Sequence, residues 1–329
     1  MTTRRRCVQA VAFTALPAVT RSIAAQTVGG VFRVGYLSNQ SRATGEAYIS
    51  GFFEGMRQRG YVEGKNLLLE FRGADGDLSR LPALAAELVA WRPDVLVVAA
   101  PPGVRAAMAA TRTIPIVFAT VSDPVAQGFV ASLGRPGGNV TGIANQSEDI
   151  IPKHVELVRE LLPLARRIAL LINPTQTQAL IFEPVAIAAA QRVGLRIVPL
   201  RQGSRAEIDK TYELLERDRP DALIVTLDPF LHSFRKITID AVARLRLPAI
   251  YPAPLYSDDG GLISFGFDLR ESFKRAATYV DKILKGAKPS DLPIEQPLKF
   301  EMVVNLNSAR ALGLAIPNVV LLRADRVIE

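Results

Sequence analysis

Short runs of consecutive apolar residues alternate along the chain with longer segments in which apolar residues recur at helical spacing. The first pair is a strand expected at 33–37 and a helix expected at 46–59. The same alternation predicts strands at 67–71, 94–100 and 114–119, and helices at 80–91 and 104–111. Because continuously apolar strands between helices are buried on both faces, the pattern predicts an α/β fold with parallel sheets.

The strand pattern occurs twice along the chain, with matching residues. Three pairs of segments correspond in the same order: RVGYL at 33–37 with RIALL at 167–171, RPDVLVV at 92–98 with RPDALIV at 219–225, and IPIVF at 114–118 with LPAIY at 247–251. Each half also ends in a glycine-flanked strand, GGNVTGI or GGLISFG. Because this period far exceeds that of solenoid repeats, the repetition predicts two lobes of like topology.

The C-terminal section resembles neither half. An amphipathic helix is expected at 271–285, a strand at 299–305, and a short helix at 308–312 that Asn307 caps and Gly313 ends. We expect this section to be shared between the lobes. Two doubly wound parallel-sheet lobes joined by a hinge are therefore predicted, the first at 31–144 plus about 267–297 and the second at 145–266 plus about 298–329.

Residues 1–25 have the composition of an export signal. Arg4, Arg5 and Arg6 precede an apolar stretch at 8–19, and small residues suited to cleavage follow. A disordered basic arm or a membrane anchor is the alternative interpretation, although the apolar stretch is too short to span a bilayer. The signal predicts a cleaved, periplasmic protein, with the Sec and twin-arginine routes both open.

Removal of this signal changes what the composition implies. The chain is 49% hydrophobic and 22% charged with a formal charge of +8, and losing Arg4, Arg5, Arg6 and Arg21 with no acidic residue lowers that charge by four to +4. The only cysteine, Cys7, leaves as well, so no disulfide and no thiolate chemistry is expected. The remaining basic residues are scattered and no helix-turn-helix segment precedes the first lobe, so no nucleic-acid partner is expected.

Small polar or acidic residues stand where the predicted strands end, several of them directly before a proline. In a doubly wound sheet, the loops at the carboxyl ends of the strands surround the ligand. The candidate ligand-binding residues at these positions are Ser38, Asn39, Pro102, Ser122, Asp123, Asn173, Asp228, Phe230 and Tyr251. An Asp or Asn before proline also caps the helix that follows, so simple capping is the alternative for each such site.

The chemistry of these side chains predicts a division of roles. Asp123 and Asp228, one from each lobe, are suited to hold an ammonium group. Helix N-terminal amides, together with Ser38, Asn39 or Asn173, are suited to hold a carboxylate. The side chains available to cover an apolar portion of the ligand are Phe230, Tyr251 and Tyr36. The expected ligand is a small organic solute that bears an amine and a carboxylate or an aromatic group, with amino acids among the candidates.

The sequence contains no recognisable catalytic constellation. His154 and His232 lie on separate predicted helices without metal-ligand spacing, and each is expected to be a surface or core residue. Neither a P-loop nor a G-x-S-x-G nucleophile elbow occurs. We therefore expect no enzymatic activity, no cofactor and no metal site.

Several motifs are similar to those of one protein family. GYVEGKN at 60–66, SDPVAQGFVASLGRPGGNVTGI at 122–143 and ATYVDKILKGAKP at 277–289 resemble the ABC transporter substrate-binding proteins that include tryptophan- and tyrosine-binding members. The similarity runs from about residue 33 to the C-terminus. It implies a type I periplasmic-binding-protein fold, a ligand held between two closing lobes, and a membrane permease and an ATPase as partners of a monomeric receptor.

The resemblance carries three site positions over directly: Asp123, Asn173 and Asp228 match the family's Asp-Pro and Asn-Pro loops. Two other functions share the same fold and remain open. One is a ligand-sensing partner of a membrane receptor kinase, which the neighbouring genes would distinguish from an importer component. The other is an exported enzyme that uses the same cleft, which would require a base or nucleophile there.

Overall fold

The computed structural model describes residues 30–145, 150–176, 179–296 and 300–329. The export signal expected at 1–25 lies outside the described residues. Within them, no helix is both long and apolar enough to cross a membrane.

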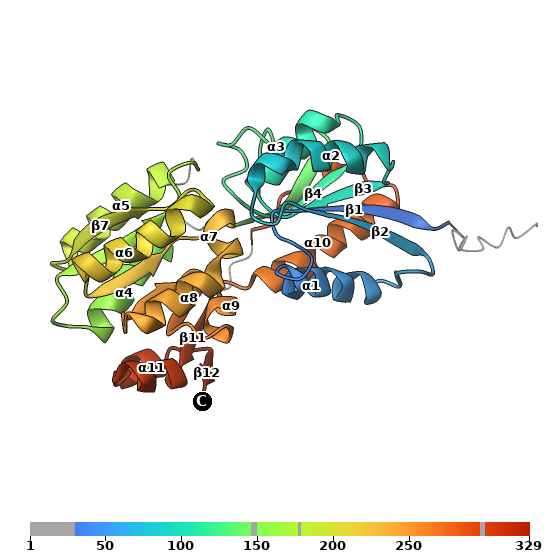
Figure 1. The fold of residues 1–329 in the computed structure, drawn as a ribbon. Coiled ribbons are helices and arrows are strands. Elements are labelled where there is room, and N and C mark those ends of the chain that lie inside the picture. The colour runs from blue at the N-terminus through green and yellow to red at the C-terminus, as the bar shows by residue number, and fades with distance from the viewer. Residues whose placement is uncertain (1–29, 146–149, 177–178, 297–299) are drawn as a thin grey trace, which may run out of the picture. The chain divides into compact units, whose positions relative to one another are not determined.

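The first half of the chain forms a parallel five-stranded sheet in the order β2-β1-β3-β4-β5. Its strands are β1 (Phe32–Ser38), β2 (Leu67–Gly73), β3 (Val95–Val98), β4 (Ile116–Ser122) and β5 (Val140–Asn145). The helices between them are α1 (Glu46–Arg57), α2 (Leu81–Ala90) and α3 (Pro101–Ala110), with a 3₁₀ turn at Leu78–Arg80. α2 and α3 cover one face, and α1 lies on the other, as Figure 1 shows. The strands predicted in this half are confirmed to within a few residues.

The second half repeats this order in a seven-stranded sheet, β7-β6-β8-β9-β10, extended by β11 and β12. Its strands are β6 (Arg167–Ile172), β7 (Arg196–Arg201), β8 (Ala222–Val225), β9 (Ala249–Tyr251), β10 (Ile263–Phe267), β11 (Phe300–Asn305) and β12 (Arg326–Ile328). All neighbours are parallel except β10 and β11, which pair antiparallel. The matching strand order explains the repeated sequence segments, because corresponding segments occupy corresponding strands.

The helices of the second half are short to medium in length. They are α4 (Ile150–Leu161), α5 (Ala179–Arg192), α6 (Ile208–Asp218), α7 (Pro229–Ser233), α8 (Arg235–Arg244), α9 (Pro254–Asp258), α11 (Leu306–Leu312) and α12 (Asn318–Leu321), with 3₁₀ turns at Arg205–Glu207 and Pro289–Asp291. The N-cap of α11 differs from the predicted one. Asn305, the last residue of β11, caps the helix by accepting from the Ser308 backbone N–H, whereas the side chain of Asn307, the predicted cap, accepts from Arg310. Gly313 ends the helix in the left-handed conformation, as predicted.

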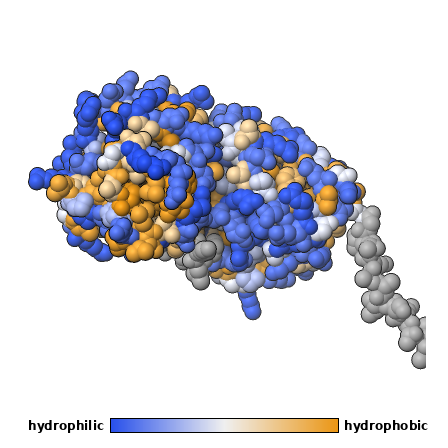
Figure 2. Space-filling model, turned by 90° about the horizontal axis from the view of Figure 1, so that it is seen from below, coloured by the Kyte–Doolittle hydropathy of each residue, from blue (hydrophilic) through white to orange (hydrophobic). Residues whose placement is uncertain are grey.

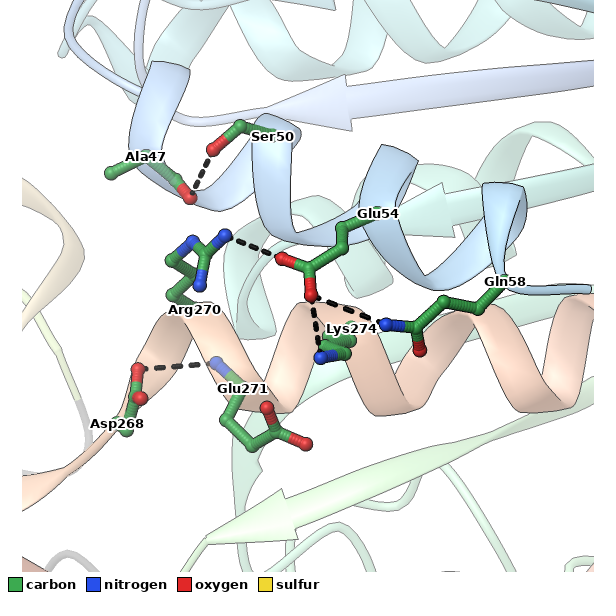
Figure 3. A network of polar contacts seen from close by, with 8 residues as sticks. All are labelled: Ala47, Ser50, Glu54, Gln58, Asp268, Arg270, Glu271 and Lys274. Carbon is green, nitrogen blue, oxygen red and sulfur yellow. Dashed lines mark hydrogen bonds and ion pairs between the residues drawn. The ribbon is translucent and has the colours of Figure 1, made fainter. Parts of the chain in front are cut away.

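Helix α10 (Leu269–Leu284) lies between β10 and β11 in the chain but packs against the first sheet and α1. α1 presents Gly51 and Gly55 to α10, so the two backbones approach closely. Figure 3 shows the polar contacts between α1 and α10: Glu54 accepts from Arg270 at 2.5 Å and from Lys274 at 2.6 Å. The Asp268 side chain caps α10 at the Glu271 N–H. The C-terminal section thus contributes a helix to the first sheet and two strands to the second.

Large apolar side chains that stay exposed lie mainly on elements around the second sheet. They include Leu164, Leu180, Ile181, Val319 and Leu322. Figure 2 shows hydrophobic surface gathered over one part of the molecule, while much of the remaining visible face is hydrophilic. Exposed apolar area of this kind is typical of contact surfaces.

Candidate functional site

A pocket with about 720 Å³ of space, part of it open to solvent, lies at the carboxyl ends of β1, β3, β4, β5 and β8. It adjoins the carboxyl ends of β1 and β3, where the strand order of the first sheet changes direction and ligands of doubly wound sheets bind. Its walls come from both halves of the chain and are largely apolar. The lining residues are Tyr36, Ser38, Asn39, Gln40, Gly45, Tyr48, Ala99, Ala100, Pro101, Thr120, Ser122, Asn145, Leu227, Asp228, Pro229, His232, Leu269 and Phe273.

Some candidate residues from the sequence meet at this pocket. Ser38, Asn39, Ser122 and Asp228 line it directly. Asn173 stands behind Asp228, and its side-chain N–H group donates to the two carboxylate oxygens at 3.2 and 3.3 Å. The predicted Pro102 is not among the lining residues. Its neighbour Pro101, at the start of α3, lines the pocket in its place.

The structure does not bring Asp123 to the pocket. Asp123 is exposed, has a φ of 38°, and its Oδ1 accepts from the Ala126 backbone N–H at 3.0 Å. It therefore acts as a capping residue of the turn after β4, which is the alternative that the sequence left open.

Phe230 and Tyr251 also lie elsewhere. Phe230 packs against Phe234 with a ring-centroid distance of 4.8 Å and lines a separate hollow. Tyr251 is 1% exposed and stacks on Tyr256 at 5.1 Å, inside the core around the second sheet. Tyr36, in contrast, forms part of the pocket wall with Phe273, at a centroid distance of 5.9 Å.

Asp228 is the acidic residue of the pocket lining. Burial raises its pKa to about 6, against the lowering effect of hydrogen bonds from the Leu231 backbone N–H and from Asn173. The Leu231 bond, at 2.9 Å, is also the N-cap of α7. With a pKa near 6, the carboxyl group is largely ionised at pH 7, so it gives the pocket a negative charge.

A contact between Tyr48 and His232 joins the two halves of the chain at the pocket. The Tyr48 hydroxyl on α1 is hydrogen-bonded to His232 Nε2 on α7, and both side chains are buried. Burial, assisted by the charge of Arg235, lowers the pKa of His232 to about 3, so the imidazole is neutral. Burial also raises the pKa of Tyr48.

Sequence reasoning missed both members of this contact. The sequence predicts a surface or core residue at His232, and the structure shows a buried side chain that also lines the pocket. The sequence contained a signal for His232, because it follows the candidate ligand-binding residue Asp228 by one helical turn. Tyr48 carried no such signal, since its helix is recognisable only by its apolar stripe.

The other histidine, His154, is a core residue, in line with the sequence prediction. It is fully buried on α4, and its Nε2 is 2.7 Å from the Phe265 carbonyl oxygen, to which the neutral imidazole donates. Burial lowers the pKa of His154 from 6.5 to about 4. Among the described residues, no group of three or more acidic, histidine or cysteine side chains is placed to hold a metal ion.

His154 is expected to make stability depend on pH. The unfolded chain takes up a proton near pH 6.5 but the native state does so only near pH 4, so stability falls as pH drops through this interval. Between pH 7 and pH 5 the loss from this group is about 2 kcal/mol. In His154→Gln, whose amide can still donate to Phe265, urea unfolding should show a pH 7 to pH 5 loss that is smaller by this amount. Equal losses in both proteins would contradict the assignment.

Comparison with known proteins identifies the family. The family model described as "ABC transporter substrate binding protein" matches residues 38–328. The chain belongs to the ABC transporter substrate-binding family. Membership implies a small-molecule ligand and a transporter partner, and this family consists of solute-binding proteins.

Individual relatives extend this result. A tyrosine-binding protein of Clostridioides difficile strain R20291 is 26% identical over 278 residues, which are 84% of this chain and 80% of the relative. The structure of an ABC domain in complex with L-Trp from Streptococcus pneumoniae has a TM-score of 0.82 at 27% identity, covering 90% of this chain and 99% of that one. A conserved domain protein from Vibrio cholerae has a TM-score of 0.83 at 31% identity, with the same coverage. Solved structures of similar fold also include a leucine-binding protein from Thermotoga maritima and a myo-inositol-bound solute-binding protein from Bacillus halodurans, which confirms the type I periplasmic-binding-protein fold predicted from the sequence.

Proposed function

We propose that this protein is the periplasmic solute-binding component of an ABC importer, and that it captures a small amine-bearing organic solute in the pocket between its two lobes. Aromatic amino acids are the first candidates. The family, the tyrosine-binding relative and the L-Trp complex support this solute class. The pocket itself supports it through its aromatic walls, Tyr36, Tyr48 and Phe273, and through the carboxylate of Asp228.

The observation that carries the proposal is the makeup of the pocket wall, which combines residues from both halves of the chain. Tyr48 on α1 meets His232 on α7 at the edge of the same pocket. A solute that contacts both walls binds the closed arrangement better than an open one, and so shifts the equilibrium between them. Closure of this kind would present a loaded receptor to the permease and ATPase of the importer.

The packing of the elements supports a proposal for the domain organisation. We propose a first lobe of residues 31–144 plus about 267–297, and a second of residues 145–266 plus about 298–329. α10 packs on the first sheet, whereas β11 and β12 extend the second. We further propose that residues 1–25 direct export to the periplasm and that the receptor acts as a monomer without catalytic activity.

Thermal unfolding in the presence of candidate solutes tests the function. L-tyrosine or L-tryptophan at about 100 times its dissociation constant should stabilise the protein by about 2.7 kcal/mol and raise the melting temperature by a few degrees. The matched variants are Asp228→Asn, which should reduce this shift, and Asp123→Asn, which should retain it, because asparagine preserves capping at both positions. A shift by sugars alone would contradict the proposed solute class.

A further inference from the structure

We propose that the pocket recognises the positively charged amino group of its solute and does not require a carboxylate, so that arylalkylamines bind about as well as the corresponding amino acids. This inference rests on the proposed function and specifies which chemical group of the solute the protein recognises.

Among the described residues that line the pocket, three side-chain oxygens have no hydrogen-bond donor. They are Asn39 Oδ1, Gln40 Oε1 and Asn145 Oδ1, on residues that are 4%, 6% and 6% exposed. Leaving such an acceptor buried without a partner is unfavourable. An ammonium group supplies three N–H donors and accepts nothing, so it suits acceptors of this kind.

A carboxamide can rotate and present its N–H₂ group instead, so these side chains alone would serve either end of an amino acid. Asn145 favours the acceptor arrangement, because its Nδ2 already donates to Thr120 Oγ1 at 2.9 Å. The charges around the pocket distinguish the two ends more strongly.

Those charges favour a cation. The described lining residues include no lysine or arginine, whereas they include the carboxylate of Asp228. The buried Arg235 on α8 is not part of the lining and pairs with Asp259 at 2.7 Å. A solute carboxylate would therefore enter a site with no charged partner and with a like charge already present, which is unfavourable at low dielectric.

Backbone sites for a carboxylate are weakened as well. α3 begins with Pro101 and Pro102, neither of which has a backbone N–H to offer at this helix N-terminus. At α7 the Leu231 N–H is taken by Asp228. α1 carries Glu46 in its first turn. The role that the sequence suggested for helix N-terminal amides, holding a carboxylate, thus finds little support at this pocket.

Isothermal titration calorimetry with two matched series tests the inference. The first series is L-tyrosine, tyramine and 3-(4-hydroxyphenyl)propionate; the second is L-tryptophan, tryptamine and indole-3-propionate. We expect at least one amine to bind with a dissociation constant no more than about fivefold above that of its amino acid. The matching acid should bind at least about 100-fold more weakly, because it lacks the charge pair with Asp228.

A second test changes the protein and leaves the solute unchanged, by adding a negative charge beside the pocket. Asn39→Asp places a second carboxylate beside the pocket, and we expect it to strengthen amine binding about tenfold, while Asp123→Asn leaves it unchanged. If an amino acid or an acid binds and its amine does not, or if Asn39→Asp weakens amine binding, the inference is overturned while the proposed function stands. If none of the six compounds binds, the proposed solute class fails, and this inference with it.

Discussion

Replacement of Gly142 by alanine is expected to destabilise the protein by more than about 4 kcal/mol, the range of severe core substitutions. A Cβ atom at this position would lie 2.0 Å from the carbonyl oxygen and 2.7 Å from the amide nitrogen of Phe118. Both atoms belong to the backbone of the neighbouring strand β4, so they cannot move aside as a flexible side chain would. Gly142 also has a φ of 151°, a conformation that residues with a Cβ rarely adopt.

Urea unfolding of Gly142→Ala measures this effect. The matched control is Gly138→Ala, four residues earlier, where a new Cβ would meet no atom within 4 Å and stability should change by less than about 0.5 kcal/mol. β5 ends at Asn145 in the pocket, so any Gly142→Ala protein that still folds should also bind solute more weakly. Equal stability of the two variants would show that β4 and β5 can separate without cost, against the close approach seen here.

The fold was predictable because its causes are local and repeated. The apolar runs that become β1, β3 and β4 are bounded by proline and glycine, and the same runs recur in β6, β8 and β9. Parallel strands buried on both faces need such runs, so the pattern identifies the layers as well as the elements. The strand order shared by the two sheets explains why corresponding segments were recognisable in order.

The site was predictable only in part, because position at a strand end does not determine where a side chain points. Asp123 and Asp228 have the same local pattern, an Asp-Pro pair after an apolar strand, yet one is exposed and the other lines the pocket. Tyr251 also stands at a strand end, but it packs in the core around the second sheet. The contact of Tyr48 with His232 joins residues 184 positions apart, and no local pattern reveals such a pairing.

The contact between α1 and α10 leads to the second large effect, in Gly55→Ala. A Cβ at Gly55 would lie 2.4 Å from the carbonyl oxygen of Lys274 and 2.7 Å from the Cβ of Ala277. The oxygen is part of the α10 backbone, so the two helices must move apart. Overpacking of this kind costs about 1–3 kcal/mol. Because Tyr48 lies two turns earlier on α1 and stacks on Phe273 of α10 at 5.5 Å, the displacement reaches the pocket wall.

Gly55→Ala should therefore lower both the free energy of unfolding and the affinity for solute, the latter by about tenfold, measured by urea unfolding and by calorimetry with L-tyrosine or tyramine. Gly134→Ala is the matched control, since a Cβ there would contact no atom within 4 Å. Glu54→Gln separates the close packing from the ion pairs with Arg270 and Lys274, which are partly solvent-exposed and should matter little. If Gly55→Ala lost stability but bound solute normally, the packing between α1 and α10 would stabilise the fold without positioning Tyr48 in the pocket.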